Sequence, residues 1–225
     1  MTAPNREQIR KMWGIFASGK DSVLELRAIW PSKSDQPSPG GPIIKHFRGI
    51  DYPTVDALRS AFEVSALQLN ARGFNIYTVM NPINSSFKGK AARDADIAFR
   101  DLLLIDIDRM DDTSRPATDE EIEAAHDLAN RVKDFLAPAG WPEPVMVMSG
   151  NGVHLYYFVD CENTEANTKA FERFLKLLAQ QFNNDFVGID TTVYNASRIT
   201  KVPGTIARKG VESEGRPYRM ATVYE

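Results

Sequence analysis

Residues 102–108 read Leu-Leu-Leu-Ile-Asp-Ile-Asp, and this stretch restricts the fold most strongly. Its run of aliphatic residues predicts a β-strand that is buried on both faces for most of its length. Side chains alternate along a strand, so Asp106 and Asp108 at its end point to the same face. Such a strand needs other elements to cover both of its faces, and these follow directly in the sequence.

The residues after this strand predict a helix, a β-hairpin, a second helix and short strands, in that order. The first helix begins with a capping box, and an Asn-Gly pair between two apolar runs is a strong signal for a hairpin. The capping box has Thr118 at the N-cap and Glu121 at N3, and the helix ends near Pro138. The other expected elements are strands over 144–148 and 153–159, a helix over 164–182, and short strands and turns from Gly188.

Two helices on one face of a largely antiparallel sheet form an α+β fold of the RNA-recognition-motif (RRM) type. We therefore expect one bilobed domain over residues 1–225, with an RRM-like lobe at 101–225 packed on an N-terminal αβ lobe at 1–100. In the N-terminal lobe the pattern predicts strands over 22–30, 43–47 and 74–80, a helix over 54–71 and a Pro- and Gly-rich loop over 31–42.

The composition is that of a globular protein, with 225 residues, 43% of them hydrophobic and 25% charged. The single cysteine excludes a disulfide framework, and no zinc site is expected. No apolar run is long enough to span a membrane, and the N-terminus lacks the apolar stretch of a signal peptide. A cytoplasmic location is the expectation.

The net charge of −3 hides an uneven distribution. Residues 1–100 contain 14 Lys and Arg against 9 Asp and Glu, residues 101–190 contain 7 against 18, and residues 191–225 contain 6 against 3. An acidic middle with basic flanks allows different parts of the surface to face different ligands. Charges scattered over a solvated surface would produce the same counts.

Asp106 and Asp108 form the first candidate site. Two ionised carboxylates on one face repel each other unless a cation compensates them, and hard divalent cations prefer oxygen ligands. The alternative is purely structural: Asp106 is a turn residue at a strand end, and Asp108 pairs with Arg109. The pair alone does not decide between these interpretations.

The stretch Ser149-Gly150-Asn151-Gly152-Val153-His154 is the second candidate site. Glycines let a ligand approach the backbone, whose amides suit phosphate oxygens. Ser149 and His154 each offer a hydrogen-bond donor beside this turn. A plain hairpin with His154 facing solvent, or packed in the core, remains the alternative.

The third candidate site lies between Ile189 and Thr205. Asp190 provides a further carboxylate after an apolar residue, and Arg198 and Lys201 follow before a Pro-Gly turn. Each residue alone is compatible with a turn or a solvated surface. Together they can complete a metal site and hold a triphosphate, because Arg is suited to bidentate phosphate contacts.

The three motifs, in this order and at these spacings, resemble those of the archaeo-eukaryotic primase (AEP) superfamily, and most closely the primase-polymerases of plasmids, phages and mobile elements. The resemblance covers about residues 74–205. It implies the AEP fold, and a DNA primase or polymerase that makes or extends primers on a single-stranded DNA template. The absence of a cysteine cluster departs from relatives that bind zinc. No helicase motif is present, so coupled unwinding would require a helicase domain or protein as a partner.

The resemblance also implies a role for each motif. The carboxylates bind two divalent ions, Mg²⁺ or Mn²⁺, for catalysis, and the glycine turn and the later cations bind the incoming NTP or dNTP. The residues concerned are Asp106, Asp108 and Asp190 for catalysis and metal, and Ser149, Gly150, Gly152, His154, Arg198 and Lys201 for the nucleotide.

Template binding is expected from basic residues just before the acidic strand. Single-strand binders combine positive grooves with aromatic platforms. The residues in question are Lys88, Lys90, Arg93 and Arg100, with Phe87 as a stacking platform; Arg208, Lys209, Arg216 and Arg219 form a second possible phosphate track. Solvated surface loops are the alternative for both groups.

Two other functions remain open at this stage. A non-catalytic replication module that binds single-stranded DNA and nucleotide would not need all three carboxylates. A sugar-nucleotide transferase would use the Asp-x-Asp pair but would be indifferent to a DNA template. The choice between ribo- and deoxyribonucleotides depends on contacts around a 2′-hydroxyl, which the sequence does not specify.

Overall fold

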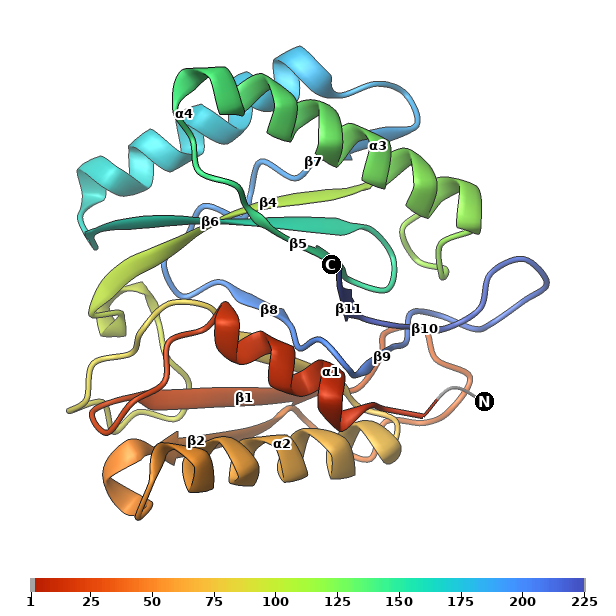
Figure 1. The fold of residues 1–225 in the computed structure, drawn as a ribbon. Helices are drawn as coiled ribbons and strands as arrows, with labels where there is room; N and C mark the ends of the chain where they lie inside the picture. Colours follow the sequence, from red (N-terminus) through yellow and green to blue (C-terminus); the bar gives the residue numbers. More distant parts are fainter. Residues whose placement is uncertain (1–2, 225) are drawn as a thin grey trace.

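The computed structural model describes residues 3–224 and is built on two larger antiparallel sheets (Figure 1). Helices α3 and α4 lie on one side of the second sheet, and the first sheet lies on its other side with α1 and α2. Within this range, none of the helices combines the length and apolar character needed to cross a membrane. The α+β architecture expected from the sequence is confirmed.

The N-terminal sheet has the strand order β2-β1-β3-β8. Helix α2 packs on one face of this sheet through apolar residues at helical spacing, including Leu58, Phe62 and Leu69. The elements are α1 (Arg6–Lys11), η1 (Met12–Gly14), β1 (Val23–Ile29), β2 (Ile43–Arg48), η2 (Gly49–Asp51), α2 (Val55–Ala71), β3 (Asn75–Val79), η3 (Asp94–Asp96) and β8 (Ile199–Lys201).

The second sheet has the strand order β11-β5-β6-β4-β7. Its chain order from β4 to β7 is strand, helix, hairpin, helix and strand, as predicted. The elements are β4 (Phe99–Arg109), α3 (Asp119–Leu136), η4 (Ala137–Ala139), β5 (Val145–Met148), β6 (Val153–Glu162), α4 (Glu165–Phe182), β7 (Val187–Ile189) and β11 (Thr222–Val223); β9 (Ile206–Ala207) and β10 (Arg219–Met220) form a separate pair.

The local signals in the sequence explain several element boundaries. Thr118 and Glu121 form the predicted capping box, with Thr118 Oγ1 accepting from Glu121 N and Glu121 Oε2 accepting from Thr118 N. The hairpin predicted around Asn151-Gly152 pairs β5 with β6 in antiparallel register. These contacts satisfy backbone groups that helix ends and turns otherwise leave unpaired.

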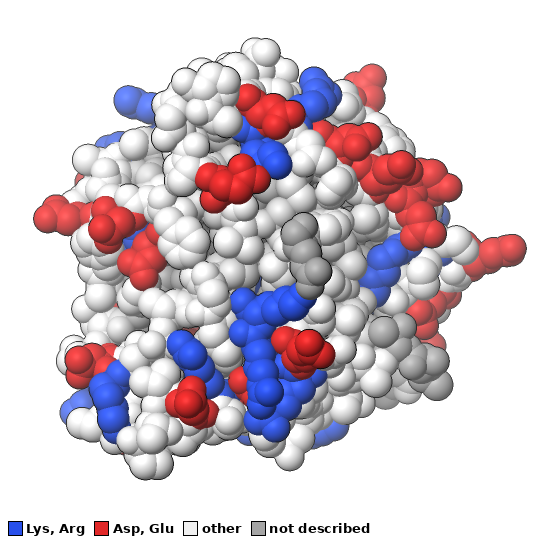
Figure 2. All heavy atoms as spheres, in the orientation of Figure 1, with Lys and Arg blue, Asp and Glu red and all other residues white. Residues whose placement is uncertain are grey.

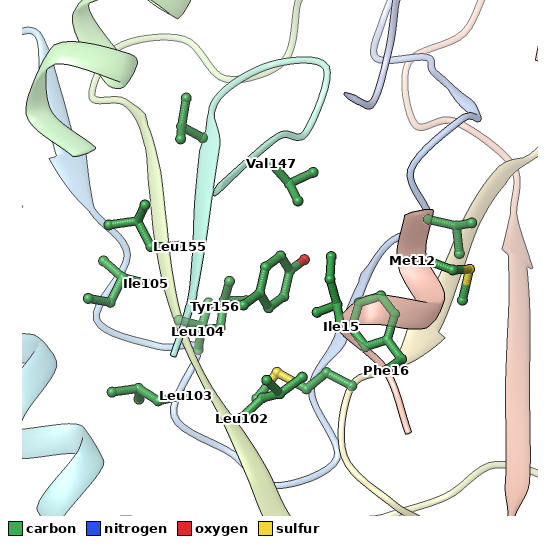
Figure 3. Packing of buried hydrophobic residues seen from close by; sticks show 14 of the residues in the cluster. Met12, Ile15, Phe16, Leu102, Leu103, Leu104, Ile105, Val147, Leu155 and Tyr156 are labelled. Atoms are coloured by element: carbon green, nitrogen blue, oxygen red, sulfur yellow. The ribbon is translucent and has the colours of Figure 1, made fainter. Parts of the chain in front are cut away.

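Strand β4 is buried on both of its faces. Leu103 and Ile105 lie on the side of the helices, whereas Leu102 lies on the side of α1 and η1, near Ile15 and Phe16 (Figure 3). This packing explains why the aliphatic run in the sequence has no polar alternation.

A smaller apolar cluster lies on the N-terminal sheet and the segment that follows β3. It fastens residues 83–97 to the sheet. Its buried members are Val23, Val79, Ile83, Phe87, Ala92, Ile97 and Ala196.

The structure corrects the predicted division between the lobes at residue 100. Strand β8, residues 199–201, pairs with β3 and so belongs to the N-terminal sheet. The chain therefore returns to the first sheet after completing most of the second. This crossing brings the third sequence motif between the two sheets.

Charge is distributed unevenly over the face seen in Figure 1. Figure 2 shows acidic atoms gathered over the N-terminal end of α3, whose first turn is acidic, and basic atoms around α1, whose last turn is basic. The acidic middle of the sequence thus does form an acidic region on this face.

Candidate active site

A cavity of about 330 Å³ lies where the two sheets meet, and it contains most of the predicted site. The end of β1, one face of β3, the inner face of β4, the turn between β5 and β6, and strand β8 with the residues around it all contribute. Its walls include Trp30, Ser32, Asn75, Tyr77, Asp106, Asp108, Ser149, Asn151, His154, Arg198, Thr200, Lys201, Arg208 and Lys209.

Asp106 and Asp108 both line this cavity, as the two-residue period of β4 predicts. Burial and the charge of Asp106 raise the pKa of Asp108 to about 6. Burial alone would also raise the pKa of Asp106, but the charge and hydrogen bond of His154, with Lys209 and Arg198, hold it below its usual value. The ionised form of Asp106 is thus stabilised, whereas the ionised form of Asp108 is destabilised by burial and by its charged neighbour.

His154 is the cross-strand partner of Asp106. Its Nε2 lies 3.3 Å from Oδ1 of Asp106, and its Nδ1 lies 3.0 Å from the hydroxyl of Tyr156. Burial lowers the pKa of His154, but the charges of Asp106 and Asp108 outweigh it and raise that pKa above its usual value. His154 is therefore a nearly buried, charge-stabilised donor at the edge of the acidic pair.

The glycine turn positions this wall through close packing. A Cβ on Gly152 would lie 2.2 Å from Oδ1 of Asp108, and a Cβ on Gly150 would lie 2.3 Å from the Cβ of Ala207. Gly150 also has a positive φ of 103°, which favours glycine. Ser149 closes the turn, since its Oγ accepts from Gly152 N at 3.1 Å.

Arg198 lines the same cavity, and so do Arg208 and Lys209. Among residues 3–224, the buried Nε of Arg198 and the buried Nη1 of Arg208 find no hydrogen-bond acceptor. Lys209 lies close enough to lower the pKa values of both Asp106 and Asp108. The acidic pair thus shares one small cavity with three cations, Arg198, Arg208 and Lys209, which together form its basic wall.

Lys201 is buried within the basic wall. Its ammonium donates to Asn75 Oδ1 at 2.9 Å and to the carbonyl of Ile206 at 3.2 Å. Burial and the charge of Arg208 lower the pKa of Lys201 well below its usual value. Asn75 also accepts from Arg208 N at 2.8 Å, so Lys201 and Asn75 brace the segment that carries Arg208.

Asp190 lies beside the acidic strand but outside the residues that line the cavity. Its backbone N–H donates to the carbonyl of Asp106 at 2.8 Å, which continues the register of β4 and β7. Its Oδ1 accepts from Thr192 N at 2.8 Å. Within residues 3–224, no three His, Cys, Asp or Glu residues are grouped closely enough to hold a metal ion. The role of Asp190 as a third ligand stays a prediction.

The expected template-binding residues divide into two groups. Lys88, Lys90 and Arg93 are exposed and line a separate groove of about 780 Å³ with Arg27. Arg100 is only 1% exposed, and its guanidinium donates to Asn163, Thr168 and the carbonyl of Tyr194.

Two parts of the template-binding prediction are therefore wrong. Arg100 is committed to contacts inside the protein and has no exposed surface for DNA. Phe87 is also buried, in the apolar cluster under residues 83–97, and offers no stacking platform. The sequence pattern did not reveal that both side chains turn inward.

The second predicted phosphate track is not a single surface. Arg216 pairs with Glu121 at 2.7 Å, and Arg219 pairs with Asp119. Arg208 and Lys209 instead join the cavity, which sequence reasoning missed. No sequence pattern indicated that Arg208 and Lys209 return to the cavity beside Lys201, because the short strand pair β9–β10 was not predicted.

The donor set of the acidic pair fits a hard divalent cation. Two carboxylates line one cavity, and burial together with the charge of Asp106 raises the pKa of Asp108, a cost that a bound cation would offset. The single cysteine, Cys161, lies on β6 outside the residues that line the cavity. The residues present suit Mg²⁺ or Mn²⁺ better than a thiophilic metal.

Comparison with known proteins gives matches to solved structures. No protein-family model matches the chain, and no curated protein matches it significantly. The AEP domain of the cyanophage S-2L primase-polymerase matches with a TM-score of 0.56 at 18% identity, covering 100% of this chain and 91% of that chain. The catalytic domain of primase RepB′, in complex with initiator DNA, matches with a TM-score of 0.51 at 8% identity, covering 98% and 84%.

A third match is the polymerase domain of Mycobacterium tuberculosis ligase D in complex with DNA, with a TM-score of 0.52 at 15% identity, covering 90% of this chain and 75% of that chain. Identities at this level establish the fold and not the activity. The chain therefore has the fold of the archaeo-eukaryotic primase catalytic domains, as its three sequence motifs predicted.

Proposed function

We propose that this protein is a template-dependent nucleotidyltransferase that synthesises or extends primers on single-stranded DNA. The observation that carries the proposal is the meeting of opposite charges in one cavity, which Asp106 and Asp108 line together with Arg198, Arg208 and Lys209. A nucleoside triphosphate with its divalent ion has the matching charges. The shared fold of primase and polymerase domains supports the same reading.

The chemistry required is phosphoryl transfer. A hydroxyl oxygen attacks the α-phosphorus of a nucleotide, a new phosphodiester bond forms, and the bond to pyrophosphate breaks. Divalent ions held by Asp106 and Asp108 would supply charge neutralisation and a more acidic attacking hydroxyl. Arg198, Arg208 and Lys209 would hold the phosphates, so the protein contributes mainly positioning and electrostatic stabilisation.

A surface for the template adjoins this cavity. Tyr77 lines the cavity, and Arg27 lines the groove with Lys88, Lys90 and Arg93. Arg27 and Tyr77 are cross-strand partners in β1 and β3, so their side chains share one face of the N-terminal sheet. We propose that a single strand follows this face from the basic groove to the cavity.

The groove has a fixed floor. Glu25, which is fully buried, accepts from Ala92 N at 2.7 Å, and Arg27 donates to the carbonyl of Ala92 at 2.8 Å. The loop with Lys88, Lys90 and Arg93 is therefore fastened to the sheet rather than free in solution. A fastened loop can present its cations to a DNA backbone at lower entropic cost.

The test is a gel assay on single-stranded DNA with Mg²⁺ or Mn²⁺ and labelled NTPs or dNTPs, with and without a primer. Asp106→Asn and Asp108→Asn should each abolish product, whereas Asp134→Asn, at an exposed position on α3, should not. Product in the unprimed lane would identify a primase, and product only with a primer would identify a polymerase.

Two results would contradict the proposal. Binding of single-stranded DNA without product under any condition, and unaffected by Asp106→Asn, would indicate a non-catalytic binding module. Product that forms without template, or transfer from a nucleotide-sugar, would indicate a sugar-nucleotide transferase.

A further inference from the structure

The side chain of His154 is held from behind by two buried hydroxyls that the proposed chemistry does not use. Its Nδ1 lies 3.0 Å from the hydroxyl of Tyr156 and 3.3 Å from Oγ1 of Thr200. The two hydroxyls also contact each other. Tyr156 is fully buried and Thr200 is 2% exposed, so solvent does not compete for these bonds.

Tyr156 itself is fixed by packing. Its ring lies edge-on to Phe16 with centroids 5.6 Å apart and edge-on to His154 at 5.8 Å. Figure 3 shows its hydroxyl pointing to the side of Ile15 and Phe16, away from Leu103 and Ile105. A hydroxyl carried by so confined a ring restricts where the bonded imidazole can lie.

Thr200 comes from the other sheet. It lies in the middle of β8, which pairs with β3, whereas His154 and Tyr156 lie on β6. The neighbours of Thr200 in the cavity wall include Arg198 and Lys201. One small hydrogen-bonded group thus joins the acidic wall to the strand that carries the basic wall.

The hydroxyls suit this task because each can both donate and accept a hydrogen bond. With Nδ1 engaged by Tyr156 and Thr200, Nε2 is left to point toward Asp106, 3.3 Å away. A side chain held at both ring nitrogens has one orientation. An imidazole without the rear contacts would be free to rotate about its Cβ–Cγ bond.

We infer that Tyr156 and Thr200 are positioning residues for His154, and that Thr200 makes the orientation of this imidazole depend on the docking of β8 against the second sheet. The imidazole of His154 thereby links the position of Asp106 on β4 to the position of β8, which carries Thr200 and Lys201. The inference rests on the proposed nucleotidyltransferase function for its kinetic consequence, but the orientation of the ring can be measured without any activity.

The experiment compares Thr200→Val, Thr200→Ser and Tyr156→Phe with a matched control, Thr78→Val. Thr78 is also 2% exposed, lies opposite Thr200 in the β3–β8 register, and does not line the cavity. Valine keeps the shape of threonine and removes its hydroxyl, while serine keeps the hydroxyl. Melting temperatures would verify that every variant is folded.

The expected kinetic result is a fall of about tenfold or more in kcat/KM for the nucleotide in Thr200→Val and Tyr156→Phe, because misplacing a group that positions the nucleotide costs rates of this order. Thr200→Ser should recover most of the loss, and Thr78→Val should behave as wild type. If Thr200 had a purely structural role, the kcat/KM values of Thr200→Val and Thr200→Ser would instead follow the melting temperatures of these variants.

The second readout is the imidazole ¹⁵N–¹H spectrum of the protein, which has three histidines, so the signal of His154 can be assigned from a His154→Gln variant. The Nδ1 and Nε2 resonances of His154 should shift in Thr200→Val and Tyr156→Phe and stay unchanged in Thr78→Val. Unchanged resonances and rates in the two hydroxyl-deleted variants would overturn the inference. If the wild type makes no product, the proposed function fails while the spectra still decide the positioning role.

Discussion

Asp106 and His154 are cross-strand partners in β4 and β6, and Oδ1 of Asp106 lies 3.3 Å from Nε2 of His154. Asp108, two residues further along the same face, is paired with Gly188 in β7, which carries no side chain to balance its charge, and its Oδ1 lies close to Gly152 of the turn. The two carboxylates therefore differ in how they affect folding. Their pKa values shift in opposite directions, so the stability effects of replacing them should also be opposite.

Replacing Asp108 with Asn should stabilise the protein at neutral pH. Its pKa is raised to about 6, so the ionised carboxylate costs stability above that pH, and the cost disappears below the unfolded pKa near 3.8. The gain should reach about 2–3 kcal/mol at pH 7. Urea denaturation of wild type and Asp108→Asn at pH 4 and pH 7 tests this; equal stability differences at both pH values would contradict it.

Replacing Asp106 with Asn should destabilise the protein at neutral pH. Its pKa is lowered, so its ionised form contributes stability above the unfolded pKa of about 3.8, which is lost as the pH falls through the folded pKa. Loss of a hydrogen bond to a charged partner costs roughly 1.5–3 kcal/mol. The same titration of urea midpoints against pH gives the sign, and a stabilised Asp106→Asn would refute the charge pairing with His154.

Arg208→Ala should weaken phosphate binding. The Nη1 of Arg208 is buried without an acceptor among residues 3–224, and a charged hydrogen bond of 1.5–3 kcal/mol corresponds to an affinity loss of roughly 10- to 150-fold. Calorimetric titration with inorganic tripolyphosphate in the presence of Mg²⁺ measures this directly. Arg131→Ala, an exposed arginine on α3, removes the same charge and should leave the affinity unchanged.

The sequence predicted the second sheet and its helices well, because their signals are local. The aliphatic run of β4, the capping box at Thr118 and the Asn-Gly turn each specify structure within a few residues. Strand periodicity alone places Asp106 and Asp108 on one face, and His154 joins them in the cavity through the pairing of β4 with β6. The acidic pair therefore needed no knowledge of long-range packing, whereas the contact of His154 with Asp106 depends on the register of two strands.

The failures all involve contacts between distant segments. Arg100 looked like a surface cation, but Thr168 on α4 and Asn163 just before that helix accept from its guanidinium. Lys201, expected to bind the triphosphate together with Arg198, does line the cavity, but the sequence did not reveal that Asn75 from β3 accepts from its ammonium. Arg208 was assigned to another surface because the return of the chain through β9 leaves no pattern in the sequence. A charge pattern does not reveal which partners tertiary packing brings to each charge.

Replacing Lys88, Lys90 and Arg93 together with Ala should weaken binding of single-stranded DNA. Each phosphate contact on a single strand contributes about 0.7 to the slope of log affinity against log salt, so three contacts should lower that slope by roughly 2. Fluorescence anisotropy with a labelled oligonucleotide at several salt concentrations gives the slope. Arg100→Lys is the internal comparison: because Arg100 is buried, its replacement should reduce stability and leave the slope unchanged.

Gly152→Ala should displace the carboxylate of Asp108, because Gly152 lies in close contact with it. An added Cβ would lie 2.2 Å from both Oδ1 of Asp108 and the carbonyl oxygen of Ile107, so either the carboxylate moves or strands β4 and β6 separate. Overpacking of this kind costs roughly 1–3 kcal/mol. Gly14→Ala is the matched control, since a Cβ there meets nothing within 4 Å. We expect Gly152→Ala to lower both the melting temperature and the affinity for Mn²⁺, measured by electron paramagnetic resonance. If Gly152→Ala binds Mn²⁺ as tightly as Gly14→Ala, the close contact between the glycine turn and Asp108 does not set the position of the carboxylate, and the turn serves only to connect β5 with β6.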